Sequence, residues 1–481
     1  MSWQTLATPR WLTRVSCGLI VGITGLLSPD AMPWAGCISS TALAETADVL
    51  PVDGKTLPSA QDAAYQWPQW RGPLTTGTAP HADPPIEWSE TKNVRWKTLL
   101  PGKGHSTPAI WGDQVFVTAA APIGTASSPH YSGAPGAHDE EPITHRQKFM
   151  VIALDRQNGK ILWEQTVRQE VPHQGGHVTA SLASSSPITD GERVFAHFGS
   201  WGLYCLDLKG KLLWQKDFGN LDSLHGHGEG SSPVLYGDHL IVNWDHEGDS
   251  FLVALDKRSG RELWKTPRER ASSWSTPIVV EHAGKPQVIV SGSKWLRAYD
   301  LANGKLIWEC GGLSVENVVA SPVAGHDMVF AGSTYDQSGV LAIRMDGAEG
   351  DLTGTEHVAW RRRRGAPYVP SPLLYGDVLL FLNHFQGGVI TRVNARTGED
   401  QPGAFRVPGI RNIFASPVAA AGRVYITSRE GLTAVLKDGD RLEVLAQNHL
   451  DDQFSASAAL VGDAIFLRGE KYLYCLALEG R

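Results

Sequence analysis

Short apolar runs alternate with turn residues along most of this chain, and the arrangement repeats. Each repeat opens with a Ser/Thr-Pro pair and continues through a Gly-Asp-type turn, an apolar run and a Leu-Asp pair. It closes with a Gly-Lys-type turn and Trp, and the clearest copy runs from Ser232 to Trp264. Four β-rich runs within a repeat, bounded by Gly, Asp or Asn, are typical of one antiparallel sheet. No segment beyond the N-terminus sustains the 3.6-residue period of a helix, which disfavours helical solenoids.

The interval between repeats indicates the architecture. The residues that open them are Pro108, Pro187, Pro233, Pro277, Pro322, Pro372, Pro417 and, in the equivalent position, Ala458. After a long first interval the spacing is about 40–50 residues, which with four strands per repeat is typical of a β-propeller. The stretch 119–148, rich in Ala, Pro, Gly, Ser and His, accounts for the long interval and is predicted to be an inserted loop.

The two ends of the repeat region complement each other. The last repeat, Ala456–Arg481, supplies only three strands, and the missing strand with its Trp stands at the other end as Asn93–Thr98. Pairing of the two would close a ring and cover an exposed sheet edge. We therefore predict an all-β fold over residues 67–481, an eight-bladed β-propeller of four-stranded antiparallel blades closed by an N-terminal strand. One miscounted repeat would leave seven blades.

The N-terminal segment has a different pattern. Two arginines precede an uncharged run, Val15–Leu27, and small residues form an Ala-x-Ala-like site that ends at Ala44. This predicts a secretory signal peptide over residues 1–44, followed by a polar linker over 45–66, and a periplasmic or secreted protein. Lipid anchoring at Cys37 is the alternative. The apolar run is short for a membrane span, so no transmembrane segment is expected after cleavage.

Charge and cysteine content narrow the functional classes. The formal net charge is −7, and nothing in this balance favours a nucleic-acid partner. The basic cluster Arg361–Arg364 is interpreted as a solvated outer strand and loop, with an anionic partner as the alternative. Three cysteines follow the predicted cleavage site, Cys205, Cys310 and Cys475. They are predicted to be small buried residues, not a disulfide framework.

The recurring Asp, Gly and Trp residues are predicted to be structural. In the turn from Asp256 to Gly260, the Asp side chain can accept hydrogen bonds from backbone N–H groups, while Gly takes the positive φ. The Trp that follows is expected to lie on the outer strand and fill the wedge between neighbouring blades. Burying such a ring removes about 150–250 Å² from water, worth a few kcal/mol per blade at about 25 cal/mol/Å².

The blade phrase Ala-x-Asp-x-x-x-Gly-Lys-x-x-Trp resembles the tryptophan-docking repeat of pyrroloquinoline-quinone (PQQ) type propellers. That group includes the quinoprotein alcohol dehydrogenases and the outer-membrane assembly lipoprotein BamB. Two further phrases, Trp67–Pro73 and Asn93–Lys97, resemble a secreted bacterial branch of the group. The likeness covers about residues 67–481 and is more specific for fold than for function.

The enzymes of this group hold PQQ and Ca²⁺ in the central funnel through Glu, Asn and Asp ligands over a Trp floor. Several also carry adjacent cysteines, and this chain has no Cys-Cys pair. Glu229, Glu316 and Asn317 at the starts of blades are the candidate oxygen ligands that the resemblance implies. The Lys294-Trp295 pair could face the funnel, although Trp295 is expected to pack locally.

Histidines precede the innermost strands of three consecutive repeats, so the fold would bring them to one rim. The candidate metal ligands are His105, His177, His225, His227 and Glu229, with His173 and His246 nearby. Imidazoles and a carboxylate could bind Zn²⁺, Cu²⁺ or Fe²⁺, or act as acid–base groups near neutral pH. The alternative is that these histidines hydrogen-bond loop backbone and face water.

Three classes of function follow. The favoured one is a non-catalytic binding or scaffold protein of the cell envelope with an envelope protein partner, because no nucleophile constellation, P-loop or His-Glu-x-x-His motif is present. The second is a PQQ- or metal-dependent oxidoreductase acting on alcohols or sugars through the funnel. The third is a carbohydrate or small-ligand binder that uses exposed aromatic residues. The candidates for that role are Trp111, Trp201, Trp274 and Tyr368. A closed ring has no need to associate, so a monomer is expected.

Overall fold

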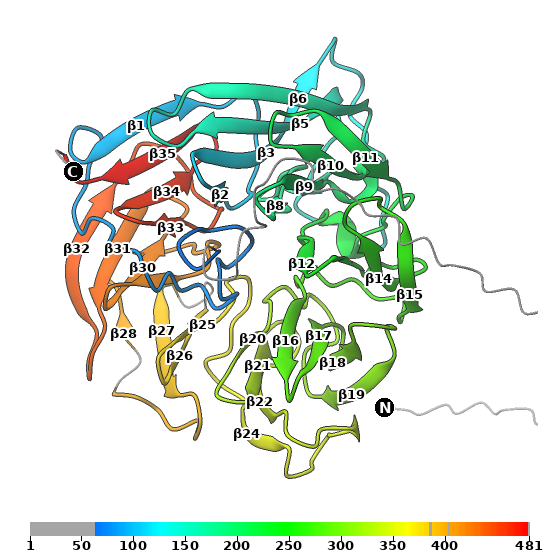
Figure 1. The fold of residues 1–481 in the computed structure, drawn as a ribbon, viewed down its shortest axis with the longest axis vertical. Coiled ribbons are helices and arrows are strands. Elements are labelled where there is room, and N and C mark those ends of the chain that lie inside the picture. Colours follow the sequence, from blue (N-terminus) through cyan, green and yellow to red (C-terminus); the bar gives the residue numbers. More distant parts are fainter. Residues whose placement is uncertain (1–62, 384–386, 403–404, 480–481) are drawn as a thin grey trace, which may run out of the picture. The chain divides into compact units, whose positions relative to one another are not determined.

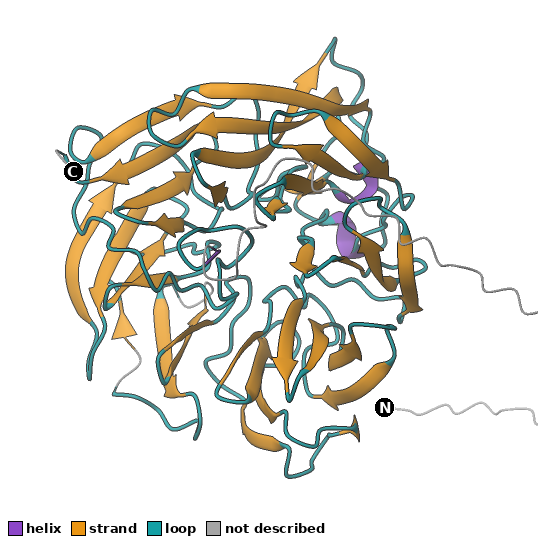
Figure 2. Cartoon of the chain, in the orientation of Figure 1, coloured by secondary structure: helices purple, strands orange, loops and turns teal. Residues whose placement is uncertain are grey.

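The computed structural model of this chain describes residues 63–383, 387–402 and 405–479. The predicted signal peptide and most of the predicted linker lie outside the described residues. In the described part of the unit Leu57–Arg481, eight four-stranded antiparallel sheets follow one another in chain order around a ring (Figure 1). Strands supply nearly all of the regular structure, with two short 3₁₀ turns, η1 (Gly199–Trp201) and η2 (Leu224–Gly226), among these residues (Figure 2). The predicted all-β, eight-bladed propeller is confirmed.

Each blade runs from an inner strand beside the centre of the ring to an outer strand at its rim. The first blade consists of β2 (Ala109–Trp111), β3 (Gln114–Ile123), β5 (Arg146–Asp155) and β6 (Ile161–Glu170), and the second of β8 (Ile188–Thr189), β9 (Arg193–His197), β10 (Leu203–Asp207) and β11 (Leu212–Lys216). The third blade consists of β12 (Val234–Tyr236), β13 (His239–Trp244), β14 (Phe251–Asp256) and β15 (Glu262–Pro267). The fourth consists of β16 (Ile278–His282), β17 (Lys285–Ser291), β18 (Trp295–Asp300) and β19 (Leu306–Gly311), to which β23 (Gly350–Asp351) adds in parallel.

The second four blades complete the circle. They are β20 (Val323–Gly325), β21 (Met328–Ser333), β22 (Gly339–Arg344) and β24 (Val358–Arg362); β25 (Leu373–Tyr375), β26 (Val378–Asn383), β27 (Val389–Asn394) and β28 (Phe405–Arg406); β29 (Val418–Ala420), β30 (Arg423–Thr427), β31 (Leu432–Lys437) and β32 (Glu443–His449); and β33 (Ala459–Val461), β34 (Ala464–Arg468), β35 (Tyr472–Ala477) and β1 (Val94–Leu99).

The ring closes through the N-terminal strand, as predicted. Strand β1 pairs antiparallel with β35, and Trp96 stands opposite Cys475. The first described strand is thereby built into the blade formed by the end of the chain. Residues far apart in sequence are therefore held in one hydrogen-bonded sheet.

A circular set of hydrogen bonds explains why Ser or Thr opens every repeat. In seven of the eight blades the N–H of this residue donates to the side-chain oxygen of its counterpart in the next blade, at 2.9–3.0 Å. The donor–acceptor pairs are Thr107–Ser186, Ser186–Ser232, Ser232–Thr276, Thr276–Ser321, Ser321–Ser371, Ser371–Ser416 and Ser416–Ser457. The Thr107 hydroxyl completes the circle by donating to the Ser457 carbonyl at 3.2 Å. We call these eight residues the hydroxyl ring.

The closing tryptophans join neighbouring blades, as predicted. The Trp214 indole N–H donates to the Lys257 carbonyl of the next blade at 3.0 Å. A Cβ at Gly260 would come within 2.7 Å of the Trp214 ring, so the turn requires Gly for the close approach as well as for its φ of +68°. The same indole-to-carbonyl bond recurs at Trp96, Trp163, Trp264 and Trp360.

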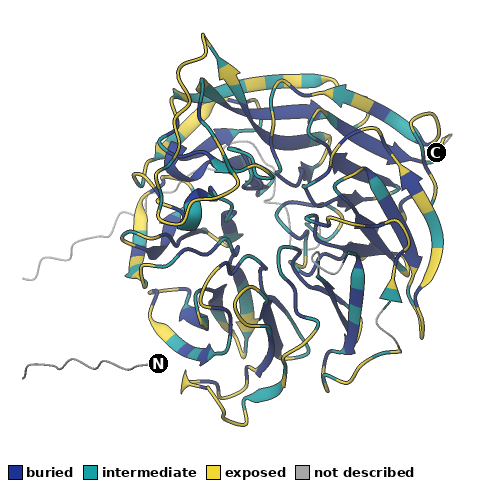
Figure 3. Cartoon of the chain, turned by 180° about the vertical axis from the view of Figure 1, so that it is seen from behind, coloured by how far each residue is buried: buried dark blue, intermediate teal, exposed yellow. Residues whose placement is uncertain are grey.

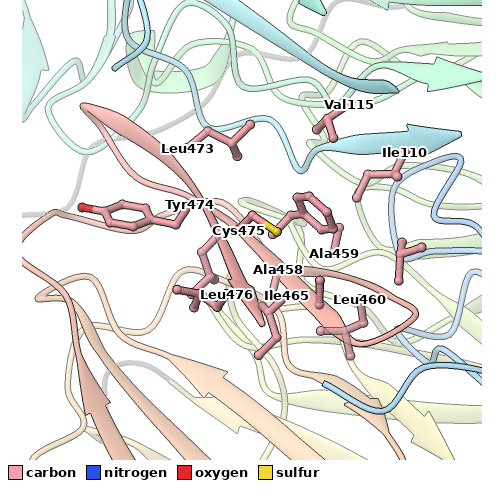
Figure 4. Packing of buried hydrophobic residues seen from close by; sticks show 14 of the residues in the cluster. Ile110, Val115, Ala458, Ala459, Leu460, Ile465, Leu473, Tyr474, Cys475 and Leu476 are labelled. Atoms are coloured by element: carbon pink, nitrogen blue, oxygen red, sulfur yellow. The ribbon is translucent and has the colours of Figure 1, made fainter. Parts of the chain in front are cut away.

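Buried residues concentrate on the inner strands of the blades, while the outer strands carry the exposed positions (Figure 3). Three cysteines of the described chain, Cys205, Cys310 and Cys475, are buried and unpaired, as predicted. Cys475 and Ile465 lie among apolar side chains that continue to Ile110 on the neighbouring blade (Figure 4). The core is therefore continuous across the seam where the ring closes.

The predicted inserted loop is shorter than expected. Strands β3 and β5 pair over ten positions, from Gln114–Asp155 to Ile123–Arg146. Residues 119–123 and 146–148 are therefore strand, and the prediction of a loop over 119–148 was wrong at both ends. The pairing with β5 outweighs the low β-propensity of the Ala- and Pro-containing end of β3. The remaining segment, 124–145, is called the insertion.

The insertion is tied to the start of the second blade. Its short strand β4 (Glu140–Glu141) pairs with β7 (Gly176–His177). Val178 also donates its N–H to the Asp139 carbonyl at 2.7 Å. These bonds hold the end of the insertion beside a segment that carries one of the predicted histidines.

The segment Trp67–Ala79, which we call the plug, contacts inner strands from several blades. Backbone hydrogen bonds join Trp67 to Ile110, Pro68 to Thr189 and Ala79 to Ala419. Between the plug and the inner strands of the third to fifth blades, a void of about 10 Å³ remains, roughly the space of one water molecule. The plug therefore lies against the inner strands of blades around the ring.

Arg71 anchors the plug. Its guanidinium donates to the Pro417 carbonyl at 2.7 Å, the Pro372 carbonyl at 2.9 Å and the Thr76 carbonyl at 3.2 Å. Burial lowers the pKa of Arg71 to about 9. Separately, no helix among the described residues is long and apolar enough to cross a membrane.

Candidate functional site

A cavity of about 460 Å³ lies at the centre of the ring, with Trp70 of the plug in its wall. The segments that precede the inner strands supply most of the lining, and the insertion supplies two residues. Besides Trp70, the lining includes His105, His138, Asp139, His177, His227, Glu229, Trp274, Asn317, Tyr335, Tyr368, Phe414 and Ser455.

Hydroxyl groups form much of the polar wall. Six members of the hydroxyl ring line the cavity: Ser186, Ser232, Thr276, Ser321, Ser371 and Ser416. Each oxygen accepts an N–H from the preceding blade. A hydroxyl that accepts one bond still carries its own O–H donor. The wall therefore offers a series of neutral donors to whatever fills the cavity.

Four further polar atoms of lining residues are buried without a partner among the described residues. They are Trp70 Nε1, His227 Nε2, Asn317 Nδ2 and Ser455 Oγ. Asn317 as a whole is 2% exposed. Neighbouring protein atoms cover these four atoms, so they do not open onto the cavity as the side chains stand.

The structure brings together three of the predicted histidines and adds one. The ring centroids of His177 and His227 are 5.0 Å apart, and those of His225 and His227 are 5.4 Å apart. His138 of the insertion lies 5.1 Å from His225 and 4.8 Å from His227, again between ring centroids. We call these four residues the histidine cluster.

Burial keeps part of the cluster neutral. Desolvation, followed by repulsion from His177, His138 and His225, lowers the pKa of His227 to about 4. Desolvation is also the largest cause that lowers the pKa of His177. Near neutral pH these rings can therefore act as hydrogen-bond donors and acceptors or as ligands through a free ring nitrogen.

Two of the predicted ligands occupy different surroundings. His105 lines the cavity without a ring contact to the cluster, and burial, followed by the charge of Arg468, lowers its pKa to about 3. The Glu229 carboxylate accepts from the Ser200 N–H at 2.7 Å and from the Ser200 hydroxyl at 2.6 Å. Desolvation raises the pKa of Glu229 to about 8 despite these bonds.

His173 and His246 are bound to loop backbone, as in the alternative interpretation. His173 Nε2 lies 3.1 Å from the Leu221 carbonyl, and His246 Nδ1 accepts from the Asp222 N–H at 3.1 Å. Across the described residues, no group of three or more His, Cys, Asp or Glu side chains is positioned to hold a metal ion as the rings stand.

The remaining candidates, Asn317, Glu316, Trp295 and the arginine run, also lie in different surroundings. Asn317 lines the cavity, whereas Glu316 lies beside the cluster, with Oε2 3.9 Å from His225 Nε2. Trp295 packs locally, with the Arg297 guanidinium 5.5 Å from the centre of its ring. Arg362 pairs with Asp400 at 2.8 Å on the outer strand β24, which agrees with the interpretation of the arginine run as an outer strand.

Two of the four predicted ligand-binding aromatics reach the cavity, Trp274 and Tyr368. Trp201 does not, and its prediction as an exposed residue was wrong. It is 3% exposed and stacks on Phe149 with ring centroids 4.9 Å apart. Trp111 lies against Gly191 in the second blade, where a Cβ would meet the indole at 2.5 Å.

Sequence reasoning missed two residues that define the site. His138 was overlooked because the insertion has no repeat register that would place it, although its Ala-His-Asp context stands out in a Gly- and Pro-rich loop. Trp70 was recognised only as part of a family phrase. The run Trp67–Pro73 lies outside the repeats and carries two Trp and an Arg, and this unusual composition is the signal that could have indicated a role at the site.

Known proteins with similar sequences support the assignment of the repeat family. A profile of the family described as outer membrane protein assembly factor BamB matches residues 82–220, 123–268 and 248–479. The chain is 24% identical over 299 residues to tetrathionate hydrolase of Acidithiobacillus ferrooxidans, covering 58% of this chain and 53% of that protein. It is 22% identical over 366 residues to polyvinylalcohol dehydrogenase of a Pseudomonas species, covering 68% and 52%. The chain thus spans about half the length of these curated relatives.

Solved structures agree on the fold. BamB from Moraxella catarrhalis superposes with a TM-score of 0.52 at 12% identity, covering 80% of this chain and 97% of that one. The computationally designed Ika8 protein superposes with a TM-score of 0.51 at 11% identity, covering 79% and 98%. Because the profile matches far more than half of its length, this chain belongs to the BamB family of PQQ-like repeat β-propellers.

Proposed function

We propose that this protein is a non-catalytic binding protein of the cell envelope whose central cavity takes a small, uncharged, oxygen-rich ligand of the carbohydrate class. The observation that carries the proposal is a cavity of about 460 Å³ whose wall combines hydroxyl groups with aromatic side chains. The six members of the hydroxyl ring that line it each keep an O–H donor. A ligand rich in acceptor oxygens would accept hydrogen bonds from these groups.

The aromatic residues around the cavity support the same class. Trp70, Trp274, Tyr335, Tyr368 and Phe414 contribute to the lining. Binding sites of this kind combine apolar and aromatic surface with a few placed polar groups. A sugar presents both an apolar ring face and hydroxyl oxygens, so it matches both parts of the wall.

The charge of the lining favours a neutral ligand. None of the described residues that line the cavity is Lys or Arg, and its carboxylates are Asp139 and Glu229. A sulfate ester or carboxylated sugar would enter without a permanent cation to pair with. An uncharged ligand incurs no such cost of burying a charge.

The same lining does not fit PQQ with Ca²⁺. The quinone carries several carboxylates, and the described wall offers no Lys or Arg to bind them. A Ca²⁺ ion takes six to eight oxygen ligands, but both Glu229 carboxylate oxygens are engaged by Ser200. We therefore propose binding in place of the redox chemistry named for the Pseudomonas relative.

Location outside the cytoplasm is part of the proposal. It is supported by the family's description as an outer membrane assembly factor and by the secretory pattern of the first 44 residues. A periplasmic or secreted monomer that captures a ligand, with or without an envelope protein partner, agrees with both.

The test is a calorimetric screen of the purified protein without a tag. The panel contains neutral mono- and oligosaccharides, their uronic-acid counterparts, and PQQ with Ca²⁺. We expect a neutral saccharide to bind one per chain. The variants Trp274→Ala and Tyr335→Ala should each weaken binding about 3- to 10-fold, since each removes aromatic surface from the cavity wall.

Tyr65→Ala is the matched control, because this side chain is 56% exposed and is not part of the cavity wall. It should leave the affinity unchanged. Preference for the uronic acids, tight binding of PQQ, or equal effects of Tyr65→Ala and Trp274→Ala would each refute the proposal.

A further inference from the structure

A second cavity, of about 230 Å³, is enclosed by the end of the insertion, the end of β3 and the segment that leads into the second blade. We call it the side cavity. It adjoins the central cavity at His177 and Ala180, which line both. A cavity of about 150 Å³ is large enough to bind benzene, so the side cavity has room for a molecule larger than benzene.

Much of its wall is aliphatic. Ile143 of the insertion is 5% exposed, and Leu182 packs against the buried core that the first two blades share. The aliphatic residues of the wall are Ala120, Pro122, Pro142, Ile143, Ala180 and Leu182. An apolar group of a ligand would therefore be removed from water on a surface that the fold already holds in place.

One positive and one negative side chain complete the wall. Among the described lining residues, Lys103 is the one Lys or Arg and Glu141 the one Asp or Glu. Both are exposed, and neither side chain forms a hydrogen bond or ion pair with another described residue. Both charges are therefore available to a ligand.

The two charged residues are held by different parts of the fold. Lys103 forms a β-bridge with Ala120 of β3, whereas Glu141 on β4 pairs with Gly176 of β7. Their backbones are thus fixed by separate ladders on either part of the wall. A ligand that uses both charges needs an anionic and a cationic group on one small molecule.

We propose that the side cavity binds a free amino acid with an apolar side chain, of the size of leucine. Its carboxylate pairs with Lys103, its ammonium group pairs with Glu141, and its side chain lies on the aliphatic wall. Hydrogen bonds between charged groups are roughly twice as strong as neutral ones. A simple carboxylate or a simple amine would leave one of the two protein charges unmatched.

The central cavity does not offer the same site. None of the described residues that line it is Lys or Arg, so it provides no permanent cation for the carboxylate of an amino acid. The two cavities therefore differ in the ligand that they favour. This inference does not depend on the proposed carbohydrate ligand.

The test is calorimetry on the purified protein without a tag, with three probes: L-leucine, 4-methylpentanoate and 3-methylbutylamine. The second probe lacks the ammonium group of leucine, and the third lacks its carboxylate. We expect one leucine to bind per chain. Each of the other two probes should bind about tenfold more weakly, since each loses one charge-assisted hydrogen bond.

Two variants assign the charges. Lys103→Ala should weaken the binding of leucine about tenfold and leave that of 3-methylbutylamine unchanged, because this probe has no carboxylate. Glu141→Ala should weaken the binding of leucine about tenfold and leave that of 4-methylpentanoate unchanged. Both side chains are exposed, so both variants should keep the fold.

Lys160→Ala and Glu262→Ala are the matched controls, because they change exposed charged residues that line neither cavity. Both should bind leucine as the wild type does. The proposal is overturned if leucine does not bind, or if Lys103→Ala binds it as tightly as Lys160→Ala. It is also overturned if Trp274→Ala in the central cavity abolishes the binding of leucine while Lys103→Ala does not.

Discussion

Serine has two distinct roles at the centre of this propeller, two residues apart in the chain. Ser457 belongs to the hydroxyl ring and accepts the Ser416 N–H at 2.9 Å. Ser455 belongs to the cavity lining, and its hydroxyl is buried without a partner among the described residues. The repeat pattern predicted the position of Ser-Pro pairs but not this division, because hydrogen-bond partners come from neighbouring blades.

The same substitution at these two positions should therefore have different effects. Ser457→Ala leaves the buried Ser416 N–H unpaired and should lower the free energy of unfolding by about 1–3 kcal/mol. Ser455→Ala removes a group that has no partner and should change it by less than about 0.5 kcal/mol. Urea denaturation of both variants measures this. An equal loss of stability in Ser455→Ala would contradict the assignment.

The cysteines give a pH-dependent prediction at the same scale. Desolvation raises the pKa of Cys205 and Cys475 to about 12, and that of Cys310 to about 11. The thiolate is the reactive form, so at pH 8 the folded protein should resist iodoacetamide at all three. Unfolding in urea should expose them to labelling, followed by peptide mass spectrometry. Stoichiometric labelling of Cys205, Cys310 or Cys475 in the native protein at pH 8 would contradict the burial.

At the scale of elements, the contact between one blade's Trp and the next blade's Gly turn holds the ring together. Its positions could be predicted from the sequence, because Asp, Gly and Trp recur at fixed offsets. The ends of β3 and β5 could not, since Ala and Pro carry little strand signal and only the ladder between the two strands extends them. The plug was missed for a related reason, because it has no periodic pattern.

Two glycines of the third blade distinguish the packing of a tryptophan against a turn from the backbone strain of the turn itself. Both have positive φ, +68° at Gly260 and +57° at Gly237, but only Gly260 faces the Trp214 ring; a Cβ at Gly237 meets nothing within 4 Å. Gly237→Ala should cost about 1–2 kcal/mol for its left-handed backbone. Gly260→Ala should cost about 1–3 kcal/mol more, because its Cβ clashes with the indole.

Thermal and urea unfolding of the two variants measures this difference. If Gly260→Ala is no less stable than Gly237→Ala, the tryptophan is not packed against the turn as described.

At the scale of the whole molecule, closure of the ring determines which segments line the central cavity. His105, His177 and His227 come from three consecutive repeats and line one cavity, because the ring places the segments before the inner strands side by side. That much followed from the repeat and its register. Which histidines touch did not follow, because His138 arrives from an insertion and Glu229 turns away to bind Ser200.

N-terminal deletions test closure. A chain lacking residues 1–79 loses the plug but keeps β1, and one lacking residues 1–99 also loses β1 and exposes the edge of β35. We expect the second chain to be less stable than the first by several kcal/mol, since Trp96 is 7% exposed in the closed ring. It should also aggregate, because it presents an unpaired strand edge. Equal stability and solubility of the two chains would contradict closure by β1.

We propose that the cavity at the centre of the ring binds a neutral saccharide. The decisive experiment is a high-resolution crystal structure of the protein with the tightest saccharide from the calorimetric screen. We expect one saccharide in the cavity, with its oxygens within hydrogen-bond distance of the hydroxyl ring and its apolar face against aromatic side chains of the wall such as Trp274. A cavity that holds only water at saturating saccharide, or a saccharide bound elsewhere on the protein, would show that the proposal is wrong.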